Sequence, residues 1–191
     1  MLNIVLASAS PRRLALLKQL GIDASVNVVD IDETPLRSEA AQDYVLRLAA
    51  EKSLAGSQQV NASDWVIGAD TCICIDDSII GKPDDYPHAQ AIWQRLSGGW
   101  HQVCTAVAMT HQQRTQTLIN VNHVCFDTIN EEQMRAYWET GEPADKAGGY
   151  AIQGLAAAWI QEIRGSYTGI MGLPLFETRQ LLIAAGYKTQ L

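Results

Sequence analysis

Residues 4–13 read Ile4-Val5-Leu6-Ala7-Ser8-Ala9-Ser10-Pro11-Arg12-Arg13, and they join a short apolar run to a leucine-rich run that stops at Gly21. The first run is β-branched and bounded, which favours a buried strand, while the leucines after Arg13 recur at helical spacing. Ser10 is predicted to cap this helix. Pro11 suits its first turn, where a missing N–H is not needed. The segment therefore predicts a strand, a turn and a helix.

The predicted turn concentrates groups that bind phosphate. Free backbone N–H groups at a helix start, the hydroxyl of Ser8 and the guanidinium groups of Arg12 and Arg13 would meet in one small volume. A capped helix with two solvated arginines is the alternative interpretation. The motif alone does not separate the two.

Length and composition predict one folded domain that spans residues 1–191. A hydrophobic content of 47% excludes a disordered chain, and no apolar run approaches the roughly 20 residues of a membrane span. No basic segment precedes the first apolar run, so we expect a cytoplasmic protein without a signal peptide. The four cysteines lie in apolar runs with neither zinc spacing nor the density of a disulfide scaffold: Cys72, Cys74, Cys104 and Cys125. Cys72 and Cys74 would share one face of a strand and are predicted to be small core residues.

The net charge of −7 argues against a nucleic acid polymer or an anionic membrane as partner, because phosphate neutralisation by many cations supplies most of that affinity. Five basic residues nevertheless lie in or beside loop signals: Arg12, Arg13, Lys52, Lys82 and Lys146. This distribution favours a compact anion as ligand.

The first half of the chain predicts further strands and one long helix. A strand over 25–29 leads to an acidic turn that contains Glu33, and a helix over 40–58 carries Lys52 on the stripe that continues from Leu48. Lys52 could deliver its ammonium to a site or extend along the surface. A strand over 64–70 ends at Asp70, before Thr71, and the small pair at 68–69 would allow a close backbone approach. A second run over 72–75 and a strand that Pro83 ends after Lys82 follow.

The second half predicts an antiparallel hairpin and a glycine-rich loop. A helix over 86–96 precedes two strands, 100–109 and 115–128, and a second helix begins at the N-cap Asn130. The loop over 145–154 contains three glycines beside Lys146 and Gln153, which is typical of a binding loop. A strand over 157–163 and a helix over 174–185 complete the chain. The hairpin predicts a mixed α/β fold with a partly antiparallel central sheet flanked by helices.

The predicted loops combine cations with carboxylates. Glu33 and Asp70 would lie among phosphate-binding cations, where acids alone would repel a polyanion. Their presence indicates a divalent metal or an activated water, and hence an enzyme rather than a binding protein.

Four motifs, in this order and spacing, resemble the Maf family over essentially the whole chain: Ser8–Arg13, Gly68–Thr71, Gly81–Pro83 and Lys146–Gly154. The resemblance implies a nucleoside triphosphate pyrophosphatase that cleaves between the α- and β-phosphates with Mg²⁺ or Mn²⁺. It also implies a fold shared with inosine triphosphate pyrophosphatases. The ending Ala151-Ile152-Gln153-Gly154 is similar to the branch that acts on dTTP and UTP.

In that branch the positions of Arg12, Thr71 and Gln153 are associated with substrate choice, and that of Asp70 with the proton acceptor. We interpret Ser8, Arg12, Arg13, Lys52 and Lys82 as contacts to the triphosphate, and Glu33 and Asp70 as metal ligands. Lys146 is either a further phosphate contact or an ion-pair partner of Asp145.

Two alternatives share the phosphate site. One is an enzyme for non-canonical purine triphosphates, and the other is a non-catalytic nucleotide-binding regulator of septum formation. A homodimer is compatible with the fold, although the sequence identifies no interface.

Overall fold

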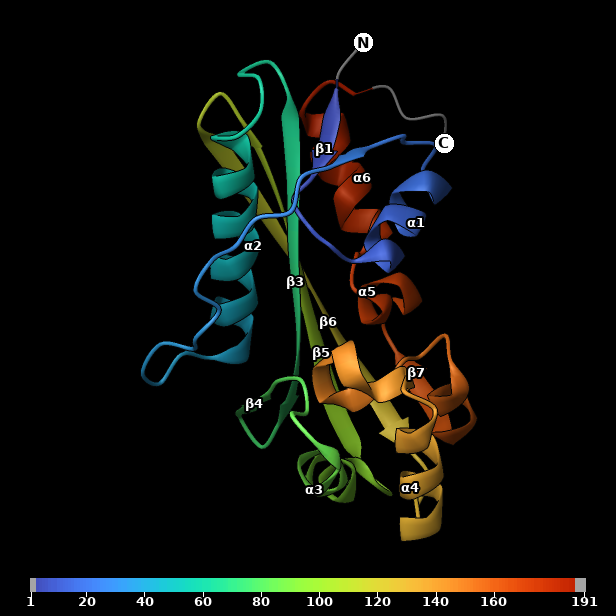
Figure 1. The fold of residues 1–191 in the computed structure, drawn as a ribbon. Helices are drawn as coiled ribbons and strands as arrows, with labels where there is room; N and C mark the ends of the chain where they lie inside the picture. Colours follow the sequence, from blue (N-terminus) through green and yellow to red (C-terminus); the bar gives the residue numbers. More distant parts are fainter. Residues whose placement is uncertain (1–2, 188–191) are drawn as a thin grey trace.

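The structure is a computed structural model that describes residues 3–187. One seven-stranded sheet runs through it in the order β2-β1-β3-β5-β6-β7, with β4 paired to β3 (Figure 1). The strands are β1 (Ile4–Leu6), β2 (Ser25–Val26), β3 (Trp65–Ile75), β4 (Ser78–Ile80), β5 (Trp100–His111), β6 (Arg114–Phe126) and β7 (Ile160–Arg164). β1 is parallel to β2 and β3, and the other pairings are antiparallel. The predicted mixed α/β fold is therefore confirmed.

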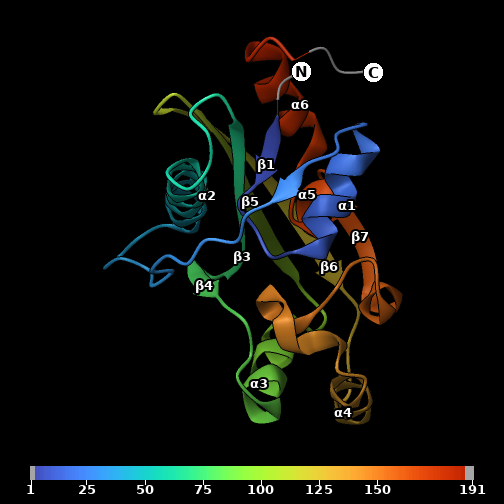
Figure 2. The ribbon, with the colours of Figure 1, turned by 45° about the horizontal axis from the view of Figure 1, so that its top comes forward.

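The helices divide between the two faces and one end of the sheet (Figures 1 and 2). α2 (Ala41–Ser57) covers one face and packs on β3, β5 and β6, whereas α1 (Pro11–Gln19), α5 (Tyr167–Met171) and α6 (Leu175–Ala184) lie on the other. α3 (Tyr86–Leu96) and α4 (Glu131–Glu139) lie together at the far end of the long strands. Three short 3₁₀ helices join α4 to β7: η1 (Glu142–Asp145), η2 (Ala147–Gly149) and η3 (Leu155–Trp159). Among the described helices, none is long and apolar enough to cross a membrane.

Side-chain alternation along β3 gives each face its own core. Ile67 and Ala69 pack with leucines of α1 and α6, and each leucine buried there contributes roughly 1.5–3 kcal/mol relative to exposure. Cys72 and Cys74 point to the other face, where they pack with Cys104 beneath α2. All four cysteines are free thiols, and the burial of Cys72 and Cys74 confirms that these two are core residues.

The middle of β3 forms an open edge. On one side β3 pairs with β5 from Val66 to Cys74 without a break. On the other side β1 pairs with residues 65–67 and β4 with residues 73–75. Within the described part of the chain, residues 68–72 therefore have no neighbouring strand on that side. Asp70 and Thr71 lie in this gap, on opposite faces of the sheet because successive side chains alternate.

Several predicted boundaries were wrong. The runs over 64–70 and 72–75 form one continuous strand, β3, and the strand predicted over 25–29 is reduced to the two residues of β2. Residues 157–159 belong to η3, so β7 begins only at Ile160. Helix α5 was not predicted. The predicted domain limits, 1 and 191, lie outside the described residues.

The contact between α2 and β3 depends on Gly68. A Cβ atom at this position would lie 2.4 Å from the carbonyl oxygen of Ala49 and 2.6 Å from the backbone nitrogen of Ser53. Both atoms belong to the helix backbone, which cannot move aside as a flexible side chain can. The predicted close approach at residues 68–69 is thus made by α2 itself, and it places Lys52 above Asp70.

Gly68→Ala should therefore lower the free energy of unfolding, by about 1–3 kcal/mol, which is typical of an overpacked core. Gly81→Ala is the matched control, because no atom lies within 4 Å of its added Cβ. Urea unfolding of the two variants measures the difference. Equal stability of both variants would contradict the tight contact.

Candidate active site

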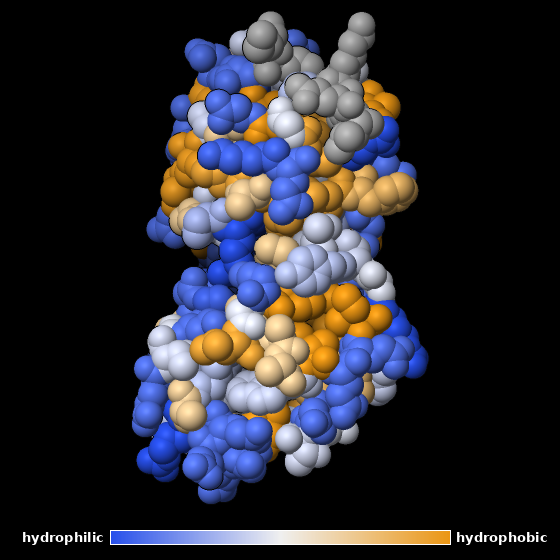
Figure 3. Space-filling view, turned by 90° about the vertical axis from the view of Figure 1, so that its right-hand side faces the viewer, coloured by the Kyte–Doolittle hydropathy of each residue, from blue (hydrophilic) through white to orange (hydrophobic). Residues whose placement is uncertain are grey.

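An open cleft of about 620 Å³ lies along the uncovered edge of β3. Figure 3 shows the hollow that narrows the molecule between its two halves, with hydrophilic residues gathered in it. The structure brings all ten predicted site residues to its wall: Ser8, Arg12, Arg13, Glu33, Lys52, Asp70, Thr71, Lys82, Lys146 and Gln153. They come from six separate segments of the chain, so the cleft is a product of the fold.

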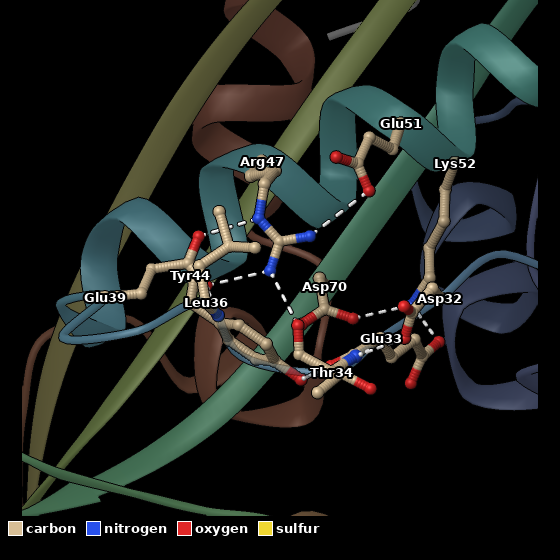
Figure 4. A network of polar contacts seen from close by, with 10 residues as sticks. All are labelled: Asp32, Glu33, Thr34, Leu36, Glu39, Tyr44, Arg47, Glu51, Lys52 and Asp70. Atoms are coloured by element: carbon tan, nitrogen blue, oxygen red, sulfur yellow. Dashed lines mark hydrogen bonds and ion pairs between the residues drawn. The ribbon is translucent and has the colours of Figure 1, made fainter.

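Lys52 is the centre of the acidic part of this cleft (Figure 4). Its Nζ lies 2.6 Å from Asp70 Oδ1 and 2.6 Å from Glu33 Oε1. Lys52 and Asp70 are buried, whereas half of the Glu33 side chain is exposed. Of the two interpretations of Lys52, the structure thus supports the one in which its ammonium reaches a site.

The two carboxylates have opposite pKa shifts. Burial raises the pKa of Asp70 above its ordinary value of 3.8, although the charges of Lys52 and Arg13 oppose that shift. Partial burial also acts to raise the pKa of Glu33, but its hydrogen bond to Lys52 and the nearby cations outweigh this and lower it. Burial thus favours proton uptake by Asp70, whereas Lys52 and the nearby cations favour the anionic form of Glu33.

The same pair is suited to a metal that arrives with substrate. Within residues 3–187 no cluster of three or more His, Cys, Asp or Glu side chains could hold a metal. Mg²⁺ commonly uses only one or two carboxylates together with substrate phosphates. Glu33 and Asp70 fit that donor set, with Lys52 balancing their charge until the metal binds.

Arg13 is fixed by contacts from three segments. Its Nε donates to the Gly172 carbonyl at 2.8 Å, Nη1 to Ser8 Oγ at 3.2 Å and Nη2 to Thr71 Oγ1 at 3.3 Å. Burial lowers the pKa of its guanidinium, which still remains a cation at neutral pH because the ordinary value is 12.5. An arginine held in this way presents a preorganised charge to the cleft.

The predicted cap at Ser10 was wrong in its detail. Ser10 occupies the N-cap position of α1, but its side chain makes no capping hydrogen bond. Ser8 Oγ instead accepts the Ser10 N–H at 3.2 Å. The hydroxyl of Ser10 therefore does not occupy the first-turn N–H groups, which suits an anion at this helix start.

Asp145 forms ion pairs with two cations of the cleft wall, Arg12 and Lys146. Arg12 Nη1 lies 3.7 Å from Asp145 Oδ2, and Lys146 forms a short ion pair with the other oxygen of Asp145. Lys146 also donates to the Glu142 carbonyl at 2.6 Å. The predicted alternative in which Lys146 pairs with Asp145 is thus confirmed for the protein without substrate. A triphosphate would compete with Asp145 for both cations.

Sequence reasoning missed the residues that hold the Gln153 loop. Gln153 is exposed at the cleft, next to the buried Ile152. The Glu142 carboxylate accepts the Leu155 N–H at 3.1 Å and the Tyr137 hydroxyl at 2.7 Å. A Cβ on Gly154 would lie 2.4 Å from this carboxylate or closer, which explains the glycine. The one sequence signal for these contacts was an acid, Glu142, three residues before the predicted loop over 145–154.

Two further contacts to cleft residues were also missed. The Thr105 hydroxyl lies 3.0 Å from Thr71 Oγ1, and the Tyr44 hydroxyl donates to the Glu33 carbonyl at 2.9 Å. Burial, followed by the charges of Asp70 and Glu33, raises the pKa of Tyr44 to about 12. Tyr44 is therefore a neutral donor at physiological pH.

Comparison with known proteins gives matches along nearly the whole chain. The family model described as "Maf-like protein" matches residues 3–185. A dTTP/UTP pyrophosphatase of Aromatoleum aromaticum is 47% identical, with 97% of this chain and 96% of that protein covered. A dTTP/UTP pyrophosphatase of Hahella chejuensis is 45% identical, with 97% and 94% covered.

Among solved structures, a nucleoside-triphosphatase, or dITP/XTP pyrophosphatase, of Mycobacterium abscessus gives a TM-score of 0.45 at 17% identity. The matched region covers 96% of this chain and 94% of the Mycobacterium abscessus chain. This similarity is too low to bear on the fold or the substrate.

Proposed function

This chain belongs to the Maf family, and we propose that it hydrolyses dTTP and UTP between the α- and β-phosphates to give a nucleoside monophosphate and pyrophosphate. The observation that carries the proposal is one cleft lined by Arg13, Lys52 and Asp70, in which Lys52 pairs with Asp70 and Arg13 is bonded to the adjacent Thr71. Relatives named dTTP/UTP pyrophosphatase support the choice of substrate.

In the proposed reaction the cations bind the triphosphate and the acids act on water. Arg13 is held ready by Ser8, Thr71 and Gly172, while Arg12, Lys82 and Lys146 add charge from the cleft wall. Asp70, whose pKa is raised mainly by burial, accepts a proton from the attacking water. Lys52 stabilises the carboxylate form and compensates negative charge on the phosphates.

We propose that Glu33 and Asp70 hold Mg²⁺ or Mn²⁺ together with the substrate phosphates. When bound, the metal would polarise the phosphates and lower the charge repulsion that the two acids impose. The acids themselves need not move far, because Lys52 already gathers both of them.

A cytoplasmic location and the lack of a nucleic acid polymer as partner complete the proposal. Four free thiols suit a reducing compartment, and the net charge of −7 disfavours extended polyanions. The one small polyanion that the cleft suits is a nucleotide.

The test is a comparison of UTP, dTTP and ITP as substrates, with Mg²⁺ present and pyrophosphate detected. We expect turnover of UTP and dTTP to exceed that of ITP. ITP as the best substrate would assign the protein to the purine triphosphate class instead. Binding of UTP without turnover would favour the non-catalytic regulator.

Replacement of the cleft cations should weaken catalysis without unfolding the protein. Arg12→Ala, Arg13→Ala and Lys82→Ala each remove one phosphate contact, and each should lower kcat/KM for UTP by roughly 10-fold or more, since a hydrogen bond to a charged group is worth about 1.5–3 kcal/mol. Steady-state kinetics and thermal unfolding measure the two effects. Normal hydrolysis with a much lower Tm in all three variants would make these residues structural.

A further inference from the structure

The loop that carries Glu33 contains almost no packing of its own. Residues 27–40 form neither helix nor strand, and most of them, Glu33 included, are exposed. Such a segment cannot hold a carboxylate in place through burial, so its geometry must come from polar contacts with the neighbouring α2.

Arg47 of α2 supplies most of these contacts (Figure 4). Its Nε and Nη2 donate to the two carboxylate oxygens of Glu39 at 2.7 and 2.8 Å, and Nη2 also donates to the Thr34 carbonyl at 3.2 Å. Its Nη1 lies 3.3 Å from Glu51 on the next helical turn. The two-pronged pair with Glu39 is the strong, directional form of an ion pair, and both side chains are largely buried.

The contacts of Arg47 fix the loop on the C-terminal side of Glu33. Glu39 also accepts the Leu36 N–H at 2.9 Å, which closes the loop on itself. The Thr34 carbonyl is held by Arg47, while the adjacent Glu33 carbonyl accepts the Tyr44 hydroxyl at 2.9 Å. The backbone is thus restrained at Glu33 and at its neighbour, and the Glu33 carboxylate is left directed at Lys52.

We propose that Arg47 is a positioning residue of the active site. It clamps the loop through Glu39 and the Thr34 carbonyl, and thereby holds Glu33 against Lys52 and beside Asp70. Arg47 itself does not line the cleft, so it acts on the reaction through Glu33. This inference depends on the proposed function for its kinetic part, whereas its structural part stands on the contacts alone.

Arg47→Ala should lower kcat for UTP by about 10- to 100-fold, the usual effect of losing a group that orients a ligand or base. Glu39→Gln keeps the cation and weakens the clamp, so a smaller loss of kcat is expected. Arg47→Lys should also lose activity, because an ammonium cannot replace the planar fork. Arg164→Ala is the matched control, since Arg164 forms an exposed pair with Glu162, and neither residue lines the cleft.

A double-mutant cycle separates positioning from general destabilisation. If Arg47 acts through Glu33, Arg47→Ala should have little further effect on kcat in a Glu33→Gln background. Independent losses that multiply in the double variant would overturn the proposal.

Hydrogen exchange of the protein without substrate tests the clamp apart from activity. We expect Arg47→Ala to accelerate amide exchange in residues 30–39, with no change in β3 or β5. Unchanged exchange in this loop would overturn the proposal even if activity fell. If the wild-type protein hydrolyses no triphosphate, the proposed function fails, but the exchange result still decides whether Arg47 clamps the loop.

Discussion

Asp70→Asn is expected to lower kcat for UTP by about 10²–10⁴-fold, the range that general base catalysis supplies. Asn keeps the shape of the side chain but cannot accept a proton, and it removes one negative donor for the proposed metal. Glu33 still pairs with Lys52, so the fold should persist. Nucleotide binding, measured by calorimetry, and the Tm should change little. A folded variant with normal kcat would refute the role of Asp70.

The pH dependence provides a second measure of the same group. Only the ionised carboxylate can act as base, so kcat should fall as the pH drops through the Asp70 pKa. Burial raises that pKa, and the acid limb should therefore lie above the value of 3.8 that is ordinary for aspartate. The residual activity of Asp70→Asn should lack this limb.

UTP should be hydrolysed about 10²-fold faster than CTP or more, with a ceiling of roughly 10⁴ for a site that hydrogen-bonds one base edge. Uracil presents an acceptor at C4 beside the N3–H donor, and the amide of Gln153 offers a donor and an acceptor. Cytosine reverses both groups at nearly the same size. Values of kcat/KM for the two nucleotides measure this selectivity. Equal rates would contradict base-edge recognition.

Variants of Gln153 identify the group that recognises the base. Gln153→Ala should lower the ratio of UTP to CTP turnover by reducing activity on UTP. Gln153→Glu replaces the donor with a second acceptor and should shift the preference toward CTP, whose C4 amino group donates. Glu142→Gln leaves Gln153 in place and tests whether the contacts of Glu142 that hold the loop contribute to the preference for UTP. An unchanged ratio in Gln153→Ala would assign recognition to the loop backbone.

The sequence predicted the elements whose signals are local. α3 was predicted at its observed bounds, 86–96, and the structure adds its cap, Asp85, which accepts the His88 N–H at 2.9 Å. α4 begins after the predicted cap Asn130 in a full capping box with Gln133. The hairpin turns at Gln112 and Gln113, both with positive φ, and these residue types gave a weaker turn signal than Asn-Gly would.

The elements that were missed gave weak signals or depend on a more distant contact. α5 has only five residues, too few for a periodic pattern, although the Ser166 side chain caps it by accepting the Gly169 N–H. η3 replaces the start of a predicted strand where Glu142 accepts the Leu155 N–H. This second contact joins residues that no sequence pattern would relate.

Most cleft residues could be predicted because they lie in turns, at a helix start or in a glycine-rich loop, whereas Asp70 and Thr71 lie in the middle of β3 and Lys52 lies within α2. The residues that hold these cleft residues in place could not be predicted. Arg47 gave no signal within the amphipathic helix, Tyr44 was predicted only as part of its inner stripe, and the Gly172 carbonyl that orients Arg13 lies 159 residues away from it. Such roles arise only once the fold places the Glu33 loop beside α2 and, on the other face of the sheet, the end of α5 beside α1 (Figure 1).

The most direct test of the proposed reaction is the product of UTP in the presence of purified protein and Mg²⁺. Phosphorus NMR resolves UMP, UDP, phosphate and pyrophosphate in one spectrum. We predict UMP and pyrophosphate in equal amounts, with formation greatly slowed by Asp70→Asn. UDP with phosphate, or UTP left intact by a protein that binds it, would contradict the proposed function.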